Sequence, residues 1–220
     1  ARRITKEKIV PLAEAFRKMG SPVIHAPSPE VAVFYPEFLP RLDPGPAAAP
    51  PDPAWPPGEF RPRTGAFAEW ALPAEPEDKR WQEIIDNWRI ADAMQPQPGD
   101  VVVRTGGELH QVLKERKILW IFYVGFAANI CVLRRNYGMF AMRDRGYGTV
   151  LVRDATTALE VADTVDGETL CAHSVITAER DIGYSVSAAE LLDACVKSAA
   201  RPEPRAGGDS GIGRTTRPSK

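Results

Sequence analysis

Cys131 is the residue of this sequence whose setting could support chemistry. It lies in the segment IFYVGFAANICVL (residues 121–133), where an apolar run gives way to small residues and then to a helical pattern. A thiol in the first turn of a helix faces the positive end of the helix dipole, and amides in such a turn could hold an oxyanion. A packing role is equally compatible with the pattern, because free cysteine is among the most buried residue types.

Other ionisable side chains lie where they could assist such a thiol. Arg104 follows an apolar run. His110 lies on a predicted short helix, where it could act as a base or contact substrate, although a solvated position is the default for it. Arg134 and its neighbour Arg135 follow the cysteine and could hold an anionic substrate, although a solvated helix face is the default for them. Arginine stays protonated, so Arg104 could stabilise a thiolate or bind a carboxylate but could not transfer a proton.

Cofactor and metal motifs are not found in the sequence. It contains no P-loop, no GxGxxG and no zinc-ligand spacing, so we expect no cofactor and no metal. His25 ends a predicted strand and is better explained by a core or capping role than by metal binding. Cys171 and Cys195 fall on predicted helices and are expected to pack. An odd number of widely spaced cysteines favours a reducing, cytoplasmic setting.

Strand and helix patterns alternate along the chain. Apolar runs predict strands at residues 22–26, 99–104, 118–126, 148–156 and 184–187, and helical periodicity predicts helices at residues 4–19, 77–94, 107–117, 129–145, 166–183 and 188–200. Apolar strands between amphipathic helices predict a three-layer α/β/α domain with a mostly parallel sheet and Rossmann-like topology. Ligands of such sheets bind beyond the carboxyl ends of the strands, where Cys131 is expected.

One domain is predicted over residues 1–199, with a proline-rich insertion at 27–97. Most of the 21 prolines lie between residues 27 and 76, which predicts an extended excursion held down by four aromatic residues, Trp55, Phe60, Phe67 and Trp70. Residues 200–220 have few apolar side chains to bury and are predicted to form a disordered tail.

The overall composition is ordinary for a globular protein and does not point to a nucleic-acid or membrane partner. The net charge is −1, with 44% hydrophobic and 26% charged residues, so no global field points to nucleic acid or to an anionic membrane. No apolar run is long enough to span a bilayer. We expect a small-molecule substrate; the charge balance and the apolar pattern predict no nucleic-acid partner and no membrane partner, and homo-oligomerisation is left open.

The segment GFAANICVLRRNYGMFAMRDRGYGTVLVRDATTA resembles the signature of the isochorismatase-like cysteine hydrolases, Gly-x-Ala-Thr-Asn-x-Cys-Val followed by a helix, Arg/Lys-Gly-Tyr and a strand. The resemblance covers roughly residues 4–26 and 98–195. It implies that Cys131 attacks a carbonyl or imide carbon. It also implies a cis peptide bond between Phe126 and Ala127, with the amides of Ala127 and Cys131 as oxyanion donors.

Three departures from the family pattern stand out. Ala128 replaces the threonine of the signature, and Arg104 lies near the place of the family's lysine. The family's first strand, which carries an aspartate base, has no counterpart before the helix at residues 4–19. We therefore expect that such a strand precedes this sequence in the full-length protein. Without it, the 22–26 and 118–126 strands should either be separated by a gap or close on another segment.

Two functions remain open from the sequence. The first is an isochorismatase-like hydrolase that cleaves a small amide, imide or related substrate through Cys131, with Arg104 approaching the thiol. The alternative is a non-catalytic family member that keeps the fold to bind a ligand or a partner. Because the aspartate is missing, the chain as printed is expected to be catalytically weak, poorly stable and prone to associate through open strand edges.

Overall fold

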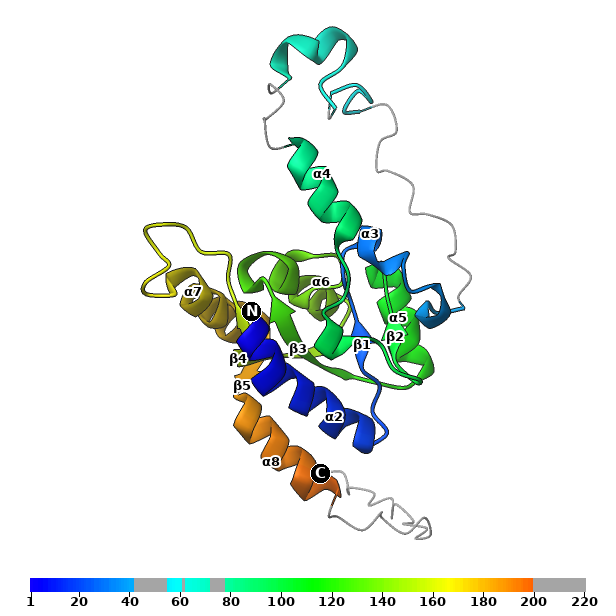
Figure 1. The fold of residues 1–220 in the computed structure, drawn as a ribbon, viewed down its shortest axis with the longest axis vertical. Coiled ribbons are helices and arrows are strands. Elements are labelled where there is room, and N and C mark those ends of the chain that lie inside the picture. The colour runs from blue at the N-terminus through cyan, green and yellow to red at the C-terminus, as the bar shows by residue number, and fades with distance from the viewer. Residues whose placement is uncertain (42–54, 61, 72–77, 200–220) are drawn as a thin grey trace, which may run out of the picture.

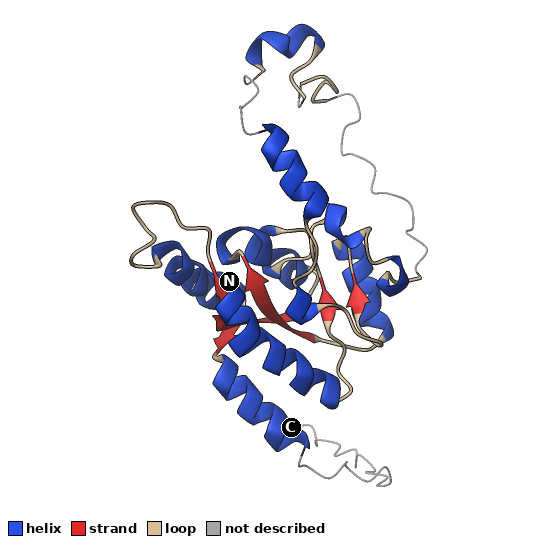
Figure 2. Ribbon diagram, viewed as in Figure 1, coloured by secondary structure: helices blue, strands red, loops and turns tan. Residues whose placement is uncertain are grey.

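The computed structural model describes residues 1–41, 55–60, 62–71 and 78–199, and the tail predicted at 200–220 lies outside them. The strands are β1 (Ile24–His25), β2 (Val101–Val102), β3 (Trp120–Phe126), β4 (Gly148–Thr157) and β5 (Tyr184–Val186). The α-helices are α1 (Arg2–Ile4), α2 (Val10–Lys18), α3 (Pro29–Ala32), α4 (Asp78–Asn87), α5 (Gly106–Glu115), α6 (Met139–Asp144), α7 (Thr169–Thr177) and α8 (Ala188–Ala199). Strands therefore alternate with helices in the order that the sequence predicts (Figures 1 and 2).

The helix predicted at residues 4–19 is confirmed, with one irregularity. A π-helical turn, η1 (Thr5–Ile9), joins α1 to α2. Pro11 follows this turn and has no backbone N–H, so it cannot complete the regular hydrogen-bond ladder there. On the buried side of α2, Phe16 packs against Phe122 of β3 with ring centroids 5.5 Å apart.

Every strand pair in the described residues is parallel, as predicted, but the strands form two sheets instead of one. β1 pairs with β2, while β3, β4 and β5 form a separate sheet in that order. In Figure 1, β1 lies between β2 and β3, so the sheet is interrupted between β1 and β3. Of the two outcomes that the sequence allows here, the structure shows the gap.

Helices cover both faces of the strands and make this a three-layer α/β/α structure, as expected. The first helix and α8 pack on one face through a core formed by Ile9, Leu12, Val152, Ala155, Ala188 and Leu191. On the other face, α5 and α6 pack on a core formed by Val101, Val103, Leu109, Val112, Leu113, Tyr137 and Met142. Ile24 of β1 and Ile121 of β3 both contact this second core. The two sheets therefore share apolar packing although no ladder joins them.

A buried ion pair ties α2 to the two-stranded sheet. Arg17 donates to both carboxylate oxygens of Asp100 at 3.0 and 2.6 Å, and Asp100 also lies 3.0 Å from Nε2 of His25. The side chains of Asp100 and His25 are 2% and 7% exposed. This places His25 in the core, the role favoured by the sequence.

Two elements differ from their sequence prediction on the cysteine side of the fold. The helix expected at residues 129–145 is broken into a π-helical turn, η5 (Ala128–Val132), and α6. Gly138 allows the break, because a Cβ at this position would lie 2.8 Å from the carbonyl oxygen of Val132. The strand predicted at residues 118–126 is also less buried than its apolar sequence suggests, since Trp120 and Phe122 of β3 are 52% and 38% exposed.

The proline-rich insertion contains helical turns where an extended path was expected. Besides α3, it forms 3₁₀ turns at Pro36–Phe38 and Gly65–Trp70. Proline starts α3 and the first of these turns, which is compatible with its chemistry because the first turn of a helix needs no N–H from it. Trp55 and Trp70 are 69% and 56% exposed, so these two do not pin the insertion as predicted.

Candidate active site

The turn from β3 into the cysteine segment has an unusual backbone. Gly125 has a φ of +110°, a region that favours glycine, and its carbonyl accepts a 2.6 Å hydrogen bond from Oγ1 of Thr156. The pairing of β3 with β4 shifts register at this point. The Phe126–Ala127 peptide bond is cis, as the resemblance predicts. The chain then enters η5, which contains Cys131.

Cys131 lies just beyond the carboxyl end of β3, at a strand-to-helix junction, as predicted. Its thiol is free and its side chain is partly exposed. Ala128, in the same turn, is completely buried, whereas Phe126 and Ala127 are partly buried. The cysteine therefore sits at the surface end of a turn whose first residue is packed into the core.

Arg135 lies one helical turn after the cysteine. Its backbone N–H donates to the carbonyl of Cys131 at 3.3 Å, which places the two residues on the same side of the turn. Its guanidinium donates to Oγ of Ser28 at 2.8 Å and to the hydroxyl of Tyr137 at 3.2 Å. The Tyr137 hydroxyl in turn donates to the carbonyl of Pro27 at 2.6 Å. The arginine is thus fixed between the cysteine turn and the segment that follows β1.

The electrostatic environment links Arg135 to the thiol. Partial burial alone would lower the pKa of the Arg135 guanidinium, but hydrogen bonding to the Cys131 side chain and the nearby Tyr137 hydroxyl raise it above its ordinary value. The pKa of Tyr137 is raised chiefly by burial. Arg135 therefore remains a cation, on the same side of the turn as Cys131.

Arg104 also lies at the carboxyl edge of the strands, directly after β2, but it is engaged elsewhere. Its Nε donates to Oε1 of Glu108 at 2.9 Å, a second guanidinium nitrogen contacts the same oxygen, and its backbone N–H donates to Oε2 at 2.6 Å. Glu108 raises the pKa of Arg104 through this hydrogen bonding. The hydrogen bonds of the described residues thus bring Arg104 to Glu108 and not to Cys131, and β1 lies between β2 and β3 (Figure 1).

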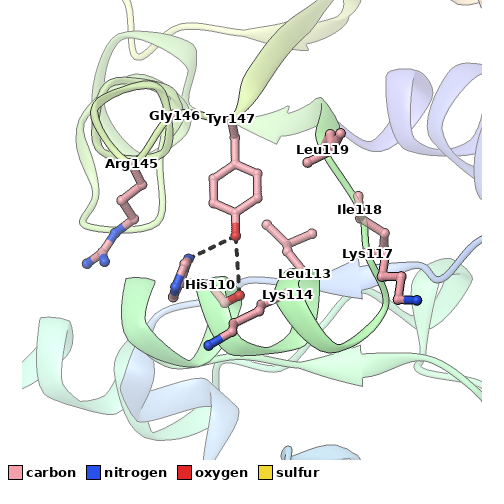
Figure 3. Close-up of a pocket in the computed structure, with 9 residues that line it drawn as sticks. All are labelled: His110, Leu113, Lys114, Lys117, Ile118, Leu119, Arg145, Gly146 and Tyr147. Carbon is pink, nitrogen blue, oxygen red and sulfur yellow. Dashed lines mark hydrogen bonds between the residues drawn. The ribbon is translucent and has the colours of Figure 1, made fainter. Parts of the chain in front are cut away.

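His110 lies at the opposite edge of the sheet. Its Nδ1 is 2.8 Å from the hydroxyl of Tyr147, the residue immediately before β4, and both line a hollow of about 450 Å³ (Figure 3). Since β3 and β4 are parallel, the amino end of β4 is remote from the carboxyl end of β3, where Cys131 lies. The structure therefore does not bring His110 to the cysteine. Cys131 does not line this hollow.

Asp154 is a carboxylate near the carboxyl end of β4, the strand that pairs with β3. Oδ1 accepts the backbone N–H of Ala188 at 2.6 Å, and Oδ2 forms a 3.0 Å ion pair with Lys8. Burial tends to raise the pKa of Asp154, but these two partners hold it below its ordinary value. Asp154 thus caps α8 and anchors the first helix.

Comparison with known families places these features in context. The family model described as the isochorismatase domain matches residues 2–174. The chain belongs to the isochorismatase family. No curated protein matches the sequence significantly.

Several solved structures are similar to this isochorismatase-family chain. A cysteine hydrolase from Pseudomonas syringae pv. phaseolicola 1448A is similar with a TM-score of 0.53 and 19% identity, covering 87% of this chain and 79% of that protein. An isochorismatase family protein from Burkholderia thailandensis gives a TM-score of 0.48 and 22% identity, with coverages of 85% and 80%. N-carbamoylsarcosine amidase from Thermoplasma acidophilum gives 0.44 and 20%, with coverages of 81% and 79%. The first of these likenesses supports the fold.

Other residues of this isochorismatase-family chain fall outside the cysteine site. Cys171 and Cys195 are buried, as expected, and burial raises the pKa of both thiols. Arg134 is exposed to solvent. The described residues hold no cluster of three or more His, Cys, Asp or Glu side chains that could bind a metal, and they include no helix capable of crossing a membrane.

Sequence reasoning identified the cysteine of this isochorismatase-family chain but not its surroundings. Arg135 was one of two adjacent arginines, and its spacing of four residues from Cys131 was the available signal. Ser28 and Tyr137 gave no such signal. Ser28 follows a different strand, and Tyr137 lies in the turn that breaks the helix expected at residues 129–145.

Proposed function

We propose that this chain is a cysteine hydrolase that uses Cys131 to cleave a small amide, imide or related substrate. The observation that carries the proposal is the contrast among the three free thiols. Cys131 lies partly exposed at the carboxyl end of a parallel strand, whereas Cys171 and Cys195 are buried. Membership of the isochorismatase family supports the same chemistry. The free thiols further favour a reducing, cytoplasmic setting.

The proposed reaction proceeds in two steps through a covalent intermediate. The Cys131 thiolate attacks the carbonyl carbon, so that a C–S bond forms and the carbonyl oxygen becomes an oxyanion. Collapse of this intermediate breaks the C–N bond, and the nitrogen leaves with a proton taken from water. The hydroxide formed from that water then attacks the thioester carbonyl and breaks the C–S bond, which releases the acid and regenerates the thiolate.

The backbone amides of Ala127 and Cys131 are proposed to hold the oxyanion. Ala127 follows the cis bond from Phe126, and Cys131 lies in the η5 turn that begins at Ala128. Donors of this kind contribute most when they are fixed before the charge develops, and Ala128 is fully packed in the core. The proposed site leaves out Arg104, which pairs with Glu108, His110, which pairs with Tyr147, and the exposed Arg134.

The proposal is tested by labelling and turnover on the purified chain. Iodoacetamide at pH 7.5, followed by peptide mass spectrometry, should modify Cys131 faster than Cys171 or Cys195. A panel of small amides and imides should then yield turnover that the Cys131→Ser variant loses. A wild-type Cys131 that is labelled no faster than the two buried thiols would overturn the nucleophile assignment.

A non-catalytic family member is the alternative, and one observation favours it. In the described residues no carboxylate or lysine forms a hydrogen bond or ion pair with Cys131, and Asp154 is engaged with Lys8 and Ala188. Fast labelling of Cys131 without turnover of any substrate in the panel would support this alternative.

A further inference from the structure

We propose that Arg135 is the cation that stabilises negative charge on the sulfur of Cys131, the role for which the sequence suggests Arg104. The inference rests on the proposed function, because it assumes that Cys131 reacts as a thiolate. It goes further by naming the residue that makes the thiol reactive, and it can fail while the nucleophile assignment holds.

Local geometry brings the two side chains together. Arg135 follows Cys131 by four residues, and the 3.3 Å hydrogen bond from its backbone N–H to the Cys131 carbonyl closes the turn between them. Residues at this spacing project from the same side of a helical turn. The cysteine segment therefore carries its own cation, independent of the strand that bears Arg104.

The guanidinium is held in place from the neighbouring sheet. Ser28, directly after the β1 segment, accepts from one terminal nitrogen at 2.8 Å, and the Tyr137 hydroxyl accepts from the other at 3.2 Å. Tyr137 is itself buried and bonded to the carbonyl of Pro27 at 2.6 Å. A planar fork fixed at two points loses little freedom on pairing with a third group. The Arg135 side chain is thus fixed in the turn that follows Cys131.

Charge pairing distinguishes Arg135 from the other candidate arginines. Arg104 is neutralised by Glu108, and Arg134 is exposed to solvent. Within the described residues, no carboxylate pairs with Arg135; its side chain donates to the hydroxyl groups of Ser28 and Tyr137. An opposite charge within about 4–6 Å favours the ionised form of an acid. The positive charge of Arg135 is therefore available to the sulfur.

The test measures alkylation of Cys131 across pH in the full chain. Second-order rates with iodoacetamide are followed by peptide mass spectrometry between pH 6 and 10, for the wild type and for Arg135→Gln, Arg135→Lys, Arg104→Gln and Arg134→Gln. Arg116→Gln, an exposed arginine at the end of α5, serves as the charge-matched control. The rates are repeated with iodoacetate, whose negative charge reports on a nearby cation.

Arg135→Gln should lower the rate at pH 7 roughly tenfold and move the alkylation profile to higher pH. It should also lower the rate with iodoacetate more than the rate with iodoacetamide. Arg135→Lys should recover part of both effects, because it keeps the charge but not the two-point attachment. Arg104→Gln, Arg134→Gln and the control should stay within about twofold of the wild type, since surface charges are largely screened.

The outcomes separate this inference from the proposed function. Fast labelling of wild-type Cys131 with an unchanged profile in Arg135→Gln would overturn the role of Arg135 and leave the nucleophile intact. The same follows if Arg104→Gln or Arg134→Gln slows labelling as much as Arg135→Gln does. A wild-type Cys131 that does not react faster than the buried thiols would overturn both. Melting curves of each variant are measured by circular dichroism. They show whether a change in the labelling rate of Cys131 relative to Cys171 and Cys195 comes from unfolding.

Discussion

Two adjacent strands, β4 and β3, show how differently the two halves of this fold are held. β4 pairs with β3 on one side and β5 on the other, and Leu151 and Val152 in its centre are completely buried. β3 pairs with β4 alone, and its residues Trp120 and Phe122 are 52% and 38% exposed. β4 is thus stabilised by ladders and core packing, whereas the sheet beyond β3 depends on side-chain contacts.

Those side-chain contacts come from three places around the gap. Arg17 binds Asp100 at the amino end of β2, and Arg135 binds Ser28 beyond the carboxyl end of β1. Between them, α5 packs an apolar core against both sheets. The loss of a single polar contact should therefore destabilise the β1–β2 pair more than it destabilises the three-stranded sheet. The same gap places the candidate cysteine beside an edge that lacks a strand neighbour.

The largest effect is expected from Asp100→Asn. Removal of this carboxylate leaves Arg17 and His25 without their buried partner, and breaking such a pair costs about 3 kcal/mol. Urea unfolding measures the loss, and amide exchange should rise for Val101 and Val103 more than for β4. Asp144→Asn is the matched control, because its ion pair with Arg143 is exposed and should contribute about 0.5 kcal/mol. A loss below that of the control would show that the pair does not hold the small sheet.

Core truncations should distinguish the two adjacent strands directly. Leu151→Ala removes a side chain with no exposed surface and should cost about 3 kcal/mol. Phe122→Ala removes a larger ring that is already partly in water, and should cost about 1 kcal/mol. Denaturant midpoints at equal m-values give both numbers. Equal losses would mean that β3 is as tightly packed as β4.

Lowering the pH should weaken the polar contacts of the β1–β2 sheet before those of the β3–β4–β5 sheet. Burial lowers the pKa of His25 below its ordinary 6.5, although Asp100 opposes this, and hydrogen bonds from Arg17 and His25 hold the pKa of Asp100 below 3.8 against its burial. Between pH 6.5 and the folded pKa of His25, the unfolded chain binds more protons, so stability falls as pH falls, by at most about 1.4 kcal/mol per unit. A further loss follows as pH drops below 3.8 and through the folded pKa of Asp100.

Unfolding curves at pH 7, 6 and 5 measure the first of these losses. His25→Gln removes the titrating group, so the decline between pH 7 and 5 should flatten in this variant whatever its absolute stability. A decline of the same size in the wild type and in His25→Gln would assign the pH dependence to other groups.

The sequence predicted the order and type of the elements well because each depends on local patterns. Apolar runs located β4, and the periodicity of residues 4–19 located the first helix. The exposure of β3 could not be predicted from its own residues, because WIFYVGF is as apolar as a buried strand and burial depends on what the rest of the folded chain packs against it. The break before α6 likewise depends on close contact at Gly138.

In the candidate site, too, features set by local sequence could be predicted and features set by tertiary contacts could not. Cys131 and the cis bond before it were found through a motif that is contiguous in sequence. Ser28 reaches Arg135 across 107 positions, so only the folded chain could reveal that contact. Arg104 was expected at the cysteine because strand ends of one sheet meet at one edge, and that reasoning assumed the continuous sheet that the structure lacks.

The smallest effect concerns two threonines of β4, Thr149 and Thr156, and it tests how complete the packing of this strand is. Both are buried, but Oγ1 of Thr149 has no hydrogen-bond partner among the described residues, whereas Oγ1 of Thr156 donates to the carbonyl of Gly125. Replacing an unpaired buried hydroxyl by a methyl group of similar size removes a desolvation cost, so Thr149→Val should stabilise the chain by about 1 kcal/mol. Thr156→Val loses a made hydrogen bond and should destabilise it by about 1 kcal/mol. Opposite shifts in melting temperature would show that the hydrogen bonding of the hydroxyl, and not the volume of the side chain, determines the effect of each substitution on stability. Shifts of the same sign would contradict this explanation.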